Sequence, residues 1–380
     1  MAKTLRQQPN GRWRAGYTDP NRKWKYATKN TKVEAERWLR DQLVSIDRGE
    51  WIDRAARRTT VAEVADRWYD TTVNLTPKTR EGYESLLNVH VLPAFGSRRI
   101  SDVDRASVRE WLARLRTDGL SPSRVRQARS VLSLVMEFAI ESGALKSNPT
   151  RGVKVVGRSE REMLALSAEQ VERLAGEAER IWPGSEALVY LLAYGGLRWG
   201  EATALRRGRC DLRRSRVLVR ESVSEVKGKL FFGPTKTHQA RTVVLPRSVS
   251  DRIAAHLADQ DTDKGDALVF VSKAGGALRN SNWRIRVWKP ACEASKMPEG
   301  LRIHDLRHTA ASLAVSAGGN VKAVQRMLGH STATQTMDRY AHLFTDDLEA
   351  LAERLETVFV QANAYSARTE TIDDVLELVG

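Results

Sequence analysis

Apolar residues recur at intervals of three and four through residues 60–155, which is typical of amphipathic helices packed into a bundle. The apolar stripe is most continuous over residues 121–143. Pro93 and Gly96 interrupt the pattern, so residues 90–99 are expected to form a turn. The pattern predicts four or five short helices, whose expected capping residues are Thr60, Thr76, Ser101 or Asp104, and Ser121.

Alternation replaces helical spacing near the start of the chain. Large and small residues alternate over residues 11–17, and cationic and aromatic residues alternate over residues 23–27. Both patterns predict short strands, because successive side chains of a strand point to opposite faces. In the second strand, Trp24 and Tyr26 would share one face, and Lys23 and Lys25 would lie on the other.

Capping boxes mark two further helix starts. Thr31 precedes Glu34 by three residues, and Ser167 precedes Gln170 by three. The first box predicts a helix that packs on the small N-terminal sheet, and the second opens another helical region. The clearest β pattern lies beyond it, with strands expected over residues 216–221, 229–232 and 241–245.

Two charged segments without periodicity, residues 50–60 and 156–162, are predicted to be linkers. The length of 380 residues also fits two or three domains at about 150 residues each. The predicted fold is multidomain and mainly α, with a small β-sheet-plus-helix N-terminal domain, a helical middle domain and an α+β C-terminal domain. The expected divisions are residues 1–56, 57–155, a linker over 156–162, 163–360 and a tail over 361–380.

The net charge favours an anionic partner for these domains. The chain has 62 basic and 47 acidic residues, a balance of +15. Residues 1–32 hold nine of the basic residues and one acidic residue, so over half of the surplus lies in the first predicted domain. A polyanion such as nucleic acid is therefore the favoured partner. A solvated basic tail is the alternative for that stretch.

Basic side chains in three regions are candidates for contacts with DNA phosphates, and a solvated surface is the alternative for each. The first set lies in the N-terminal strands, the second beside the apolar stripe of residues 121–143, and the third before the first C-terminal strand. The candidates are Arg12, Arg14, Lys23 and Lys25; Arg124, Arg126 and Arg129; and Arg206, Arg207 and Arg213.

Several classes of protein lack support in the sequence. Two cysteines, Cys210 and Cys292, cannot form a disulfide framework or a Cys-rich zinc site. The first residues lack the apolar core of a signal peptide, and no apolar run approaches the ~18 residues of a membrane span. We therefore expect a cytoplasmic protein without membrane association. No nucleotide-binding glycine motif is found, so no cofactor is expected.

Residues 160–360 contain five places where polar residues stand next to apolar helices or strands. Taken singly, each has an ordinary structural explanation, such as a surface arginine, a solvated turn lysine or a half-buried tyrosine. Two histidines four residues apart also raise a zinc alternative, which the intervening arginine disfavours. The five places are Arg198 with Glu201 after two glycines, Lys236 in a turn, His304 with Arg307 and His308, His330 after Leu328 and Gly329, and Tyr340.

Taken together, in this order and at these separations, the five places resemble the marks of the tyrosine recombinases, or phage integrases. The family's marks are Gly-Leu-Arg, a lysine in a β-turn, His-x-x-Arg, Leu-Gly-His and a following tyrosine. The domain layout resembles that of the larger integrases, with an arm-binding domain, a helical (SAM-like) core-binding domain and an α+β catalytic domain. One departure is that Tyr340 follows His330 by ten residues, where nine is commoner.

The resemblance implies a site-specific DNA recombinase that integrates phage or mobile-element DNA into a host chromosome through a 3′-phosphotyrosine. Two arginines would neutralise the phosphate, the tyrosine would attack it, and the lysine would protonate the leaving 5′-hydroxyl. No metal or ATP is implied. Glu201 is implied to support the site, His308 to pack beside it, and the catalytic residues to be Arg198, Lys236, His304, Arg307, His330 and Tyr340.

The resemblance also implies partners, in a bacterial host cell. These are double-stranded DNA at core and arm attachment sites, further copies of the chain in a homo-tetramer, an excisionase and a DNA-bending host factor. The acidic tail over residues 361–380 carries an apolar stripe at helical spacing, from Ile372 to Val379. Docking of this tail on a neighbouring protomer is implied, and packing on its own protomer is the alternative.

Three rival functions are less favoured. A cellular resolvase of the same family would not be expected to carry the N-terminal module. A type IB topoisomerase-like enzyme would relax DNA without joining two sites. A DNA-binding regulator with an inactive site is disfavoured by the complete set of six candidate catalytic residues.

Overall fold

The computed structural model describes residues 2–20, 22–48, 58–157, 163–235, 239–340, 352–353, 355–357 and 359–360. The chain divides into two compact units, Met1–Arg161 and Glu162–Gly380. The first unit contains two separate hydrophobic cores, and each core belongs to a different kind of structure. The predicted tail over residues 361–380 lies outside the described residues.

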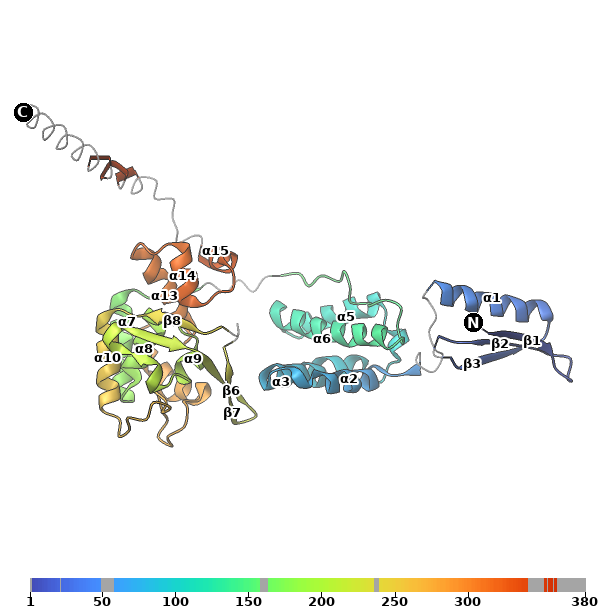
Figure 1. The fold of residues 1–380 in the computed structure, drawn as a ribbon, viewed down its shortest axis with the longest axis horizontal. Helices are drawn as coiled ribbons and strands as arrows, with labels where there is room; N and C mark the ends of the chain where they lie inside the picture. Colours follow the sequence, from blue (N-terminus) through green and yellow to red (C-terminus); the bar gives the residue numbers. More distant parts are fainter. Residues whose placement is uncertain are drawn as a thin grey trace, which may run out of the picture. The chain divides into compact units, whose positions relative to one another are not determined.

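A three-stranded antiparallel sheet begins the first unit, and one helix covers one of its faces (Figure 1). The strands are β1 (Lys3–Gln7), β2 (Trp13–Thr18) and β3 (Trp24–Lys29), and the helix is α1 (Lys32–Asp47). As predicted, Thr31 caps the helix by accepting a hydrogen bond from the backbone of Glu34. Strand β1 was not predicted, because it holds a single apolar residue among polar ones and has no alternation of its own.

The sheet register separates an aromatic face from a covered face. Ala15 and Tyr17 are buried against α1, so their neighbours along the strands point away from the helix. Trp24 and Tyr26 lie on this open face, where their rings stack with centroids 5.7 Å apart. The predicted division is therefore confirmed within β3, with Lys25 on the opposite face, whereas Lys23 precedes the strand.

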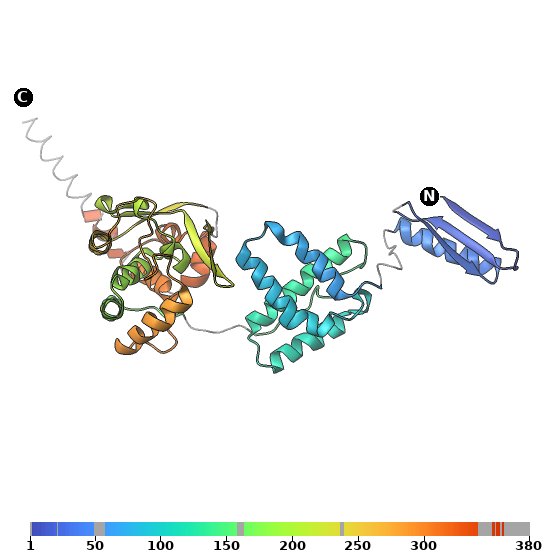
Figure 2. The same ribbon diagram turned by 90° about the horizontal axis from the view of Figure 1, so that it is seen from below.

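Helices form the second part of this unit (Figure 2). Thr60 and Glu63 make a complete capping box at its first helix, and Asp104 rather than Ser101 caps the third predicted helix. The elements are α2 (Val61–Asp70), a 3₁₀ turn (Thr71–Asn74), α3 (Pro77–Leu86), a π-helical turn (Leu87–Val91), α4 (Leu92–Phe95), a 3₁₀ turn (Ile100–Asp102), α5 (Arg105–Thr117) and α6 (Pro122–Glu141).

The prediction of a turn over residues 90–99 is wrong for its first half. The chain stays helical to Phe95, through the π-helical turn and α4. Pro93 is tolerated because it directly follows the π-helical turn, where the regular i→i−4 hydrogen bonding is already interrupted. Val91 and Phe95 are buried in the core of the bundle, and this burial favours continued helix over a solvated turn.

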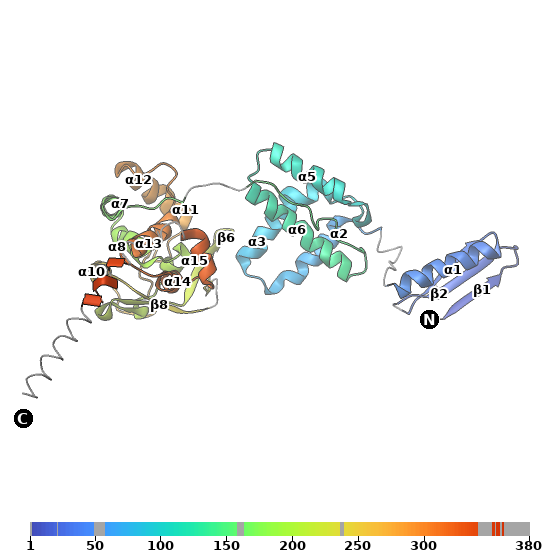
Figure 3. The ribbon, with the colours of Figure 1, turned by 90° about the horizontal axis from the view of Figure 1, so that it is seen from above.

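The second unit packs helices around a small antiparallel sheet and a separate hairpin (Figure 3). Its sheet has the order β4-β5-β8, and β6 pairs with β7. The strands are β4 (Cys210–Asp211), β5 (Arg216–Val219), β6 (Glu221–Val226), β7 (Lys229–Pro234) and β8 (Arg241–Val244). Strand formation was therefore predicted in the right region, although β6 is an additional strand rather than the end of β5.

Helices supply most of the core of this unit, and α8 lies in the middle of it. This helix is buried at almost every position and contacts α7, α10 and α13. The helices are α7 (Ala168–Ile181), α8 (Ser185–Gly195), α9 (Trp199–Thr203), α10 (Arg247–Ala258), α11 (Asn280–Trp283), a π-helical turn (Arg284–Trp288), α12 (Lys289–Ala294), α13 (Asp305–Ser316), α14 (Val321–Leu328) and α15 (Ala333–Tyr340). Within the described part of the chain, no helix is both long and apolar enough to span a membrane.

Two leucines of α6 provide a matched test of the helical core. Leu132 is fully buried, whereas Leu134 on the same helix is 38% exposed. Leu132→Ala should lower the free energy of unfolding by about 2–5 kcal/mol, because it removes apolar contacts and leaves a cavity. Leu134→Ala should cost less than about 1 kcal/mol. Urea unfolding followed by circular dichroism measures both, and equal losses would contradict this assignment of the core.

Candidate active site

Arg307 joins three segments that are far apart in sequence. This residue of α13 is only 2% exposed. Its Nη1 donates to the carbonyl oxygen of Gly196 at 2.5 Å, and its Nη2 donates to that of Leu328 at 2.6 Å. The two carbonyls lie at the C-terminal ends of α8 and α14, where helices leave acceptors unsatisfied. The predicted Gly-Leu-Arg, His-x-x-Arg and Leu-Gly-His segments therefore meet at one buried guanidinium.

Two glycines allow this close approach. Gly196 and Gly329 end α8 and α14 in the left-handed conformation, with φ of 64° and 65°. A Cβ on Gly196 would lie 2.8 Å from the side chain of Leu328, and one on Gly329 would lie 2.8 Å from that of Arg241. Both positions therefore require glycine for backbone conformation and for space.

Arg198 lies at the start of α9 and is tied to Glu201. The Arg198 backbone N–H donates to Glu201 Oε2 at 3.0 Å, and its Nη1 donates to Oε1 at 2.7 Å. Glu201 is almost completely buried, whereas the side chain of Arg198 is 26% exposed. The carboxylate thus holds the arginine by one side and leaves part of its guanidinium accessible.

Sequence reasoning missed Arg241, which is a third arginine in this cluster. Its Nη1 and Nη2 donate to the two oxygens of Glu201, at 3.2 and 2.7 Å. Burial alone would raise the pKa of Glu201, but Arg241 and then Arg198 lower it to about 2. The only signal in the sequence was that Arg241 begins the strand expected after the turn that carries Lys236.

Tyr340 lies in the same region, with its side chain inside the protein. The residue is 2% exposed, and its hydroxyl shares a hydrogen bond of 2.7 Å with Nδ1 of His308. The ring of His330 lies nearly parallel to that of Tyr340, with centroids 6.4 Å apart. His330 is itself held by a 2.9 Å hydrogen bond between its Nδ1 and Thr336. His308 was expected to have a packing role, and the structure adds a polar contact with the tyrosine.

His304 precedes α13 and is exposed, and its ring meets that of His308 edge to face at 5.3 Å. The surrounding protein and the charge of Arg307 lower the pKa of His304. Burial, followed by the charge of Arg198, lowers the pKa of Arg307 to about 9, so this guanidinium stays charged at neutral pH. The region therefore combines fixed cations with a histidine that favours its neutral form.

The zinc alternative for His304 and His308 finds no support in the donor set. Nδ1 of His308 is used by Tyr340. In the ranges that the structure describes, no group of three or more His, Cys, Asp and Glu side chains could hold a metal ion. The histidines are instead part of the cluster that surrounds Arg307.

Lys236 lies outside the described residues, so its role stays a prediction. The described residues on either side of the predicted turn contact each other. Thr235 follows β7, and its hydroxyl donates to the carbonyl oxygen of Gln239 at 2.9 Å. Arg241 begins the next strand two residues later. The two described residues that flank Lys236 are thus joined by one hydrogen bond, just before the strand that begins with Arg241.

The candidate DNA-contact arginines of the second unit are partly used within the protein. Arg206 donates to Glu221 at 2.6 Å, and Arg207 donates to Asp263 at 2.8 Å. Arg213 has an exposed side chain. These ion pairs reduce the positive charge that Arg206 and Arg207 would offer to a phosphate.

Some DNA-contact candidates of the first unit are also bound within the protein, whereas others are exposed. Arg124, Arg126 and Arg129 donate to Ser85, to the carbonyl oxygen of Gly157 and to that of Val153, respectively. In the N-terminal sheet, the guanidinium of Arg14 lies 4.0 Å from the ring centroid of Tyr26 on the open face. Lys25 is 3.7 Å from Asp19, whereas Arg12 and Lys23 are exposed beside the strands. Arg14 is thus the candidate that shares the aromatic face.

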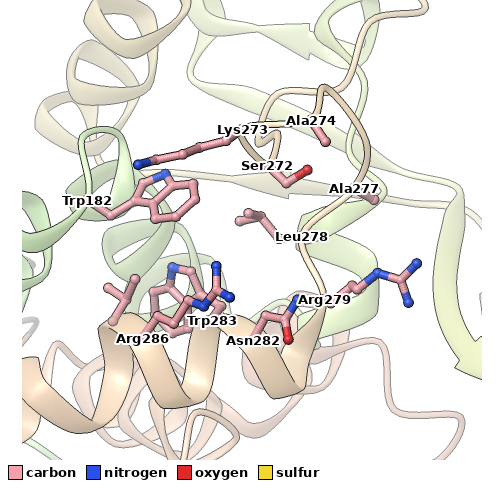
Figure 4. Close-up of a pocket in the computed structure, with 11 residues that line it drawn as sticks. Trp182, Ser272, Lys273, Ala274, Ala277, Leu278, Arg279, Asn282, Trp283 and Arg286 are labelled. Carbon is pink, nitrogen blue, oxygen red and sulfur yellow. The ribbon is translucent and has the colours of Figure 1, made fainter. Parts of the chain in front are cut away.

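A separate cavity of about 260 Å³ contains none of the predicted catalytic residues (Figure 4). Lys273 extends over the ring of Trp182, with its Nζ 5.3 Å from the centroid. Trp283 forms part of the wall and also contacts the ring of Trp199, which follows Arg198. The wall of the cavity therefore contacts the start of α9 through these two indole rings.

Comparison with known proteins gives the same family for both units. Residues 165–346 match the phage integrase family, and residues 61–155 match the phage integrase central domain. The integrase of Mycobacterium phage D29 is 30% identical over 348 residues, which cover 88% of this chain and 91% of that protein.

Two solved structures share the fold. The integrase of transposon Tn1549, in complex with transposon right end DNA, gives a TM-score of 0.70 at 22% identity over 78% of this chain and all of that one. A lambda integrase tetramer bound to a Holliday junction gives 0.55 at 18% identity over 87% of this chain and 96% of that one.

The carboxylate of Glu201 should make stability depend on pH. Its pKa falls from 4.5 to about 2 on folding, so its ionised form stabilises the fold above pH 4.5 and loses this effect as the pH falls toward 2. The loss should reach about 3 kcal/mol. The free energy of unfolding, measured with urea at several values between pH 6 and pH 2, should therefore fall more with decreasing pH for the wild type than for Glu201→Gln. Glu186→Gln, which breaks an exposed pair with Arg252, is the control. Its free energy of unfolding should keep most of the pH dependence of the wild type.

Proposed function

The chain belongs to the phage integrase family of tyrosine-type site-specific recombinases, and we propose that it cleaves and rejoins DNA through Tyr340. The observation that carries the residue assignment is the convergence on Arg307. One buried guanidinium binds the segments before Arg198 and before His330, and Tyr340 lies beside the same cluster. The site thus combines a nucleophile with cations that suit a phosphodiester.

Arg198 and Arg307 neutralise the phosphate in this mechanism. Guanidinium groups bind non-bridging phosphate oxygens well, and their charge stabilises the negative charge that develops during attack. His304 and His330 supply further hydrogen bonds. Arg198 has the accessible guanidinium, while Arg307 acts from within the protein and supplies a charge that its two carbonyl partners hold in place.

Tyr340 loses its phenolic proton to solvent, because the nearby arginines favour the phenolate. The phenolate oxygen then forms the new bond to phosphorus, and the bond to the 5′-oxygen breaks. The product is a 3′-phosphotyrosine that conserves the energy of the phosphodiester, so a second 5′-hydroxyl can reverse the step. Lys236 protonates the leaving oxygen as the general acid. No metal or nucleotide takes part in these steps.

Tyr340 must leave its buried position to react. At 2% exposure its hydroxyl cannot reach a phosphate on DNA, and its hydrogen bond to His308 holds it inside. Binding of the core site therefore has to include a movement of α15 or of the tyrosine side chain. This requirement would keep the nucleophile away from water and from unspecific DNA until a site is bound.

The other assignments follow the same proposal. Residues 57–155 and 163–360 bind the core site, residues 156–162 link them, and residues 1–56 bind arm sites through the sheet face of Arg14, Trp24 and Tyr26. The tetramer of the structurally similar lambda integrase supports a homo-tetramer on paired sites, with the tail over residues 361–380 docking on a neighbour. An excisionase and a DNA-bending host factor are further proposed partners.

The nucleophile is tested with a nicked core-site duplex, which traps the covalent intermediate. Wild-type protein should form a covalent protein–DNA adduct in the presence of EDTA, and Tyr340→Phe should form none, because it lacks the attacking oxygen. Tyr190→Phe is the matched control, since Tyr190 is also buried and bonds Glu172. An adduct with Tyr340→Phe would refute the nucleophile, and loss of the wild-type adduct in EDTA would refute the metal-free mechanism.

Deletion of residues 1–56 tests the division of labour between domains. The shortened protein should lose binding to distant arm sites and should still cleave the core site, because the sheet face is removed while both integrase-family segments remain. Mobility shifts on arm-site and core-site duplexes measure this difference. Loss of core cleavage as well would count against the division, and a plasmid integration assay separates recombination from relaxation of DNA.

A further inference from the structure

Arg241 is a largely buried cation to which the proposed chemistry assigns no task. Its side chain is 11% exposed and lies at the start of β8. Both of its Nη atoms donate to Glu201, and its Nε donates to the carbonyl oxygen of Met327 at 3.2 Å. All three nitrogens of its guanidinium therefore donate hydrogen bonds within its own domain, to α9 and α14. This leaves Arg241 unsuited to a direct contact with a phosphate.

Glu201 is shared between this arginine and a candidate catalytic one. The carboxylate is 1% exposed and receives Arg241 from one side and Arg198 from the other. With two guanidinium partners, the charge of the carboxylate is divided between them. If Arg241 were absent, the buried carboxylate would have Arg198 as its one remaining guanidinium partner among the described contacts and would hold it more tightly.

Arg241 also contacts the segment that leads to His330. Its Nε binds the carbonyl oxygen of Met327 in the last turn of α14, and its guanidinium packs directly against Gly329. A methyl group at Gly329 would lie 2.8 to 3.1 Å from three atoms of Arg241. The same side chain therefore sets the distance between α9 and the end of α14.

We infer that Arg241 is a positioning residue for DNA cleavage, which sets Arg198 through Glu201 and holds the backbone before His330 in register with it. The inference rests on the proposed function, because it concerns how the candidate catalytic residues are held. Arg241 neither touches the DNA nor exchanges a proton. Its effect is to keep one guanidinium edge of Arg198 directed toward the phosphate instead of toward the carboxylate.

Single-turnover cleavage separates this role from DNA binding. Full-length protein at saturating concentration is mixed with the nicked core-site duplex, and the rate of adduct formation is measured. Arg241→Gln should slow the rate by about 10²-fold, because small displacements of catalytic groups have effects of that size. Its affinity for the duplex, measured by mobility shift, should change by less than about threefold. Arg252→Gln is the matched control, since Arg252 pairs with Glu186 at the surface of the same unit.

A duplex with a neutral methylphosphonate at the scissile position separates positioning from general destabilisation. This linkage lacks the charge that Arg198 neutralises. On this duplex, Arg241→Gln should therefore form the adduct only about threefold more slowly than the wild type. A merely structural defect would slow both substrates equally. Arg241→Lys keeps the charge with fewer donors and should be intermediate on the natural duplex, and it serves if Arg241→Gln fails to fold.

The outcomes are distinct. If the wild type forms no adduct, or if Tyr340→Phe forms one, the proposed function fails. If the wild type reacts and Arg241→Gln reacts as fast as Arg252→Gln, the positioning role is refuted while the proposed function stands. Equal slowing on both substrates, or a loss of affinity that accounts for the whole effect, also refutes the positioning role.

Discussion

The buried guanidinium of Arg307 is the contact on which the arrangement of the site depends. Its two donated hydrogen bonds satisfy carbonyl groups at the ends of α8 and α14, and those helix ends carry the segments before Arg198 and His330. Burying a charge is unfavourable unless the charge is paired or hydrogen-bonded. Because this guanidinium needs both carbonyl groups as partners, it fixes the distance between the two helix ends. Gly196 and Gly329 complete the contact, because only glycine fits the left-handed turns and the small space there.

Charge is distributed unevenly around that contact. Arg198, Arg241 and Arg307 lie close enough to influence one another, and Glu201 is the carboxylate that they share. Arg241 and Arg198 bind it directly, so the cluster keeps a net positive charge while each buried group has a partner. A phosphodiester would complete this balance from outside. The same cluster therefore satisfies its buried polar groups within the fold and leaves an excess of positive charge at the accessible edge of Arg198, which the proposed function would use.

The total charge of +15 is a poor guide to where DNA is bound. Arg206 and Arg207 belong to ion pairs, and Arg126 and Arg129 bind backbone carbonyls of their own unit. In the N-terminal sheet, by contrast, an arginine lies against an exposed aromatic ring. Positive charge that remains beside accessible aromatic surface is the better indicator of a nucleic-acid contact, because it has not been neutralised by folding.

The sequence alone predicted the mainly helical, multidomain class, the caps at Thr31, Thr60 and Ser167, and the family of the chain, because helical spacing, capping and short motifs are local properties. It also located the β region, but not β1 or the helical course of residues 90–95, where pairing and burial outweigh local preference. The folded structure was needed to show that Arg307 joins two helix ends, that Arg241 and Arg198 share Glu201, and that the hydroxyl of Tyr340 is hydrogen-bonded to His308. These contacts span from 21 to 111 positions, and which groups meet across such distances is decided by packing of the whole domain.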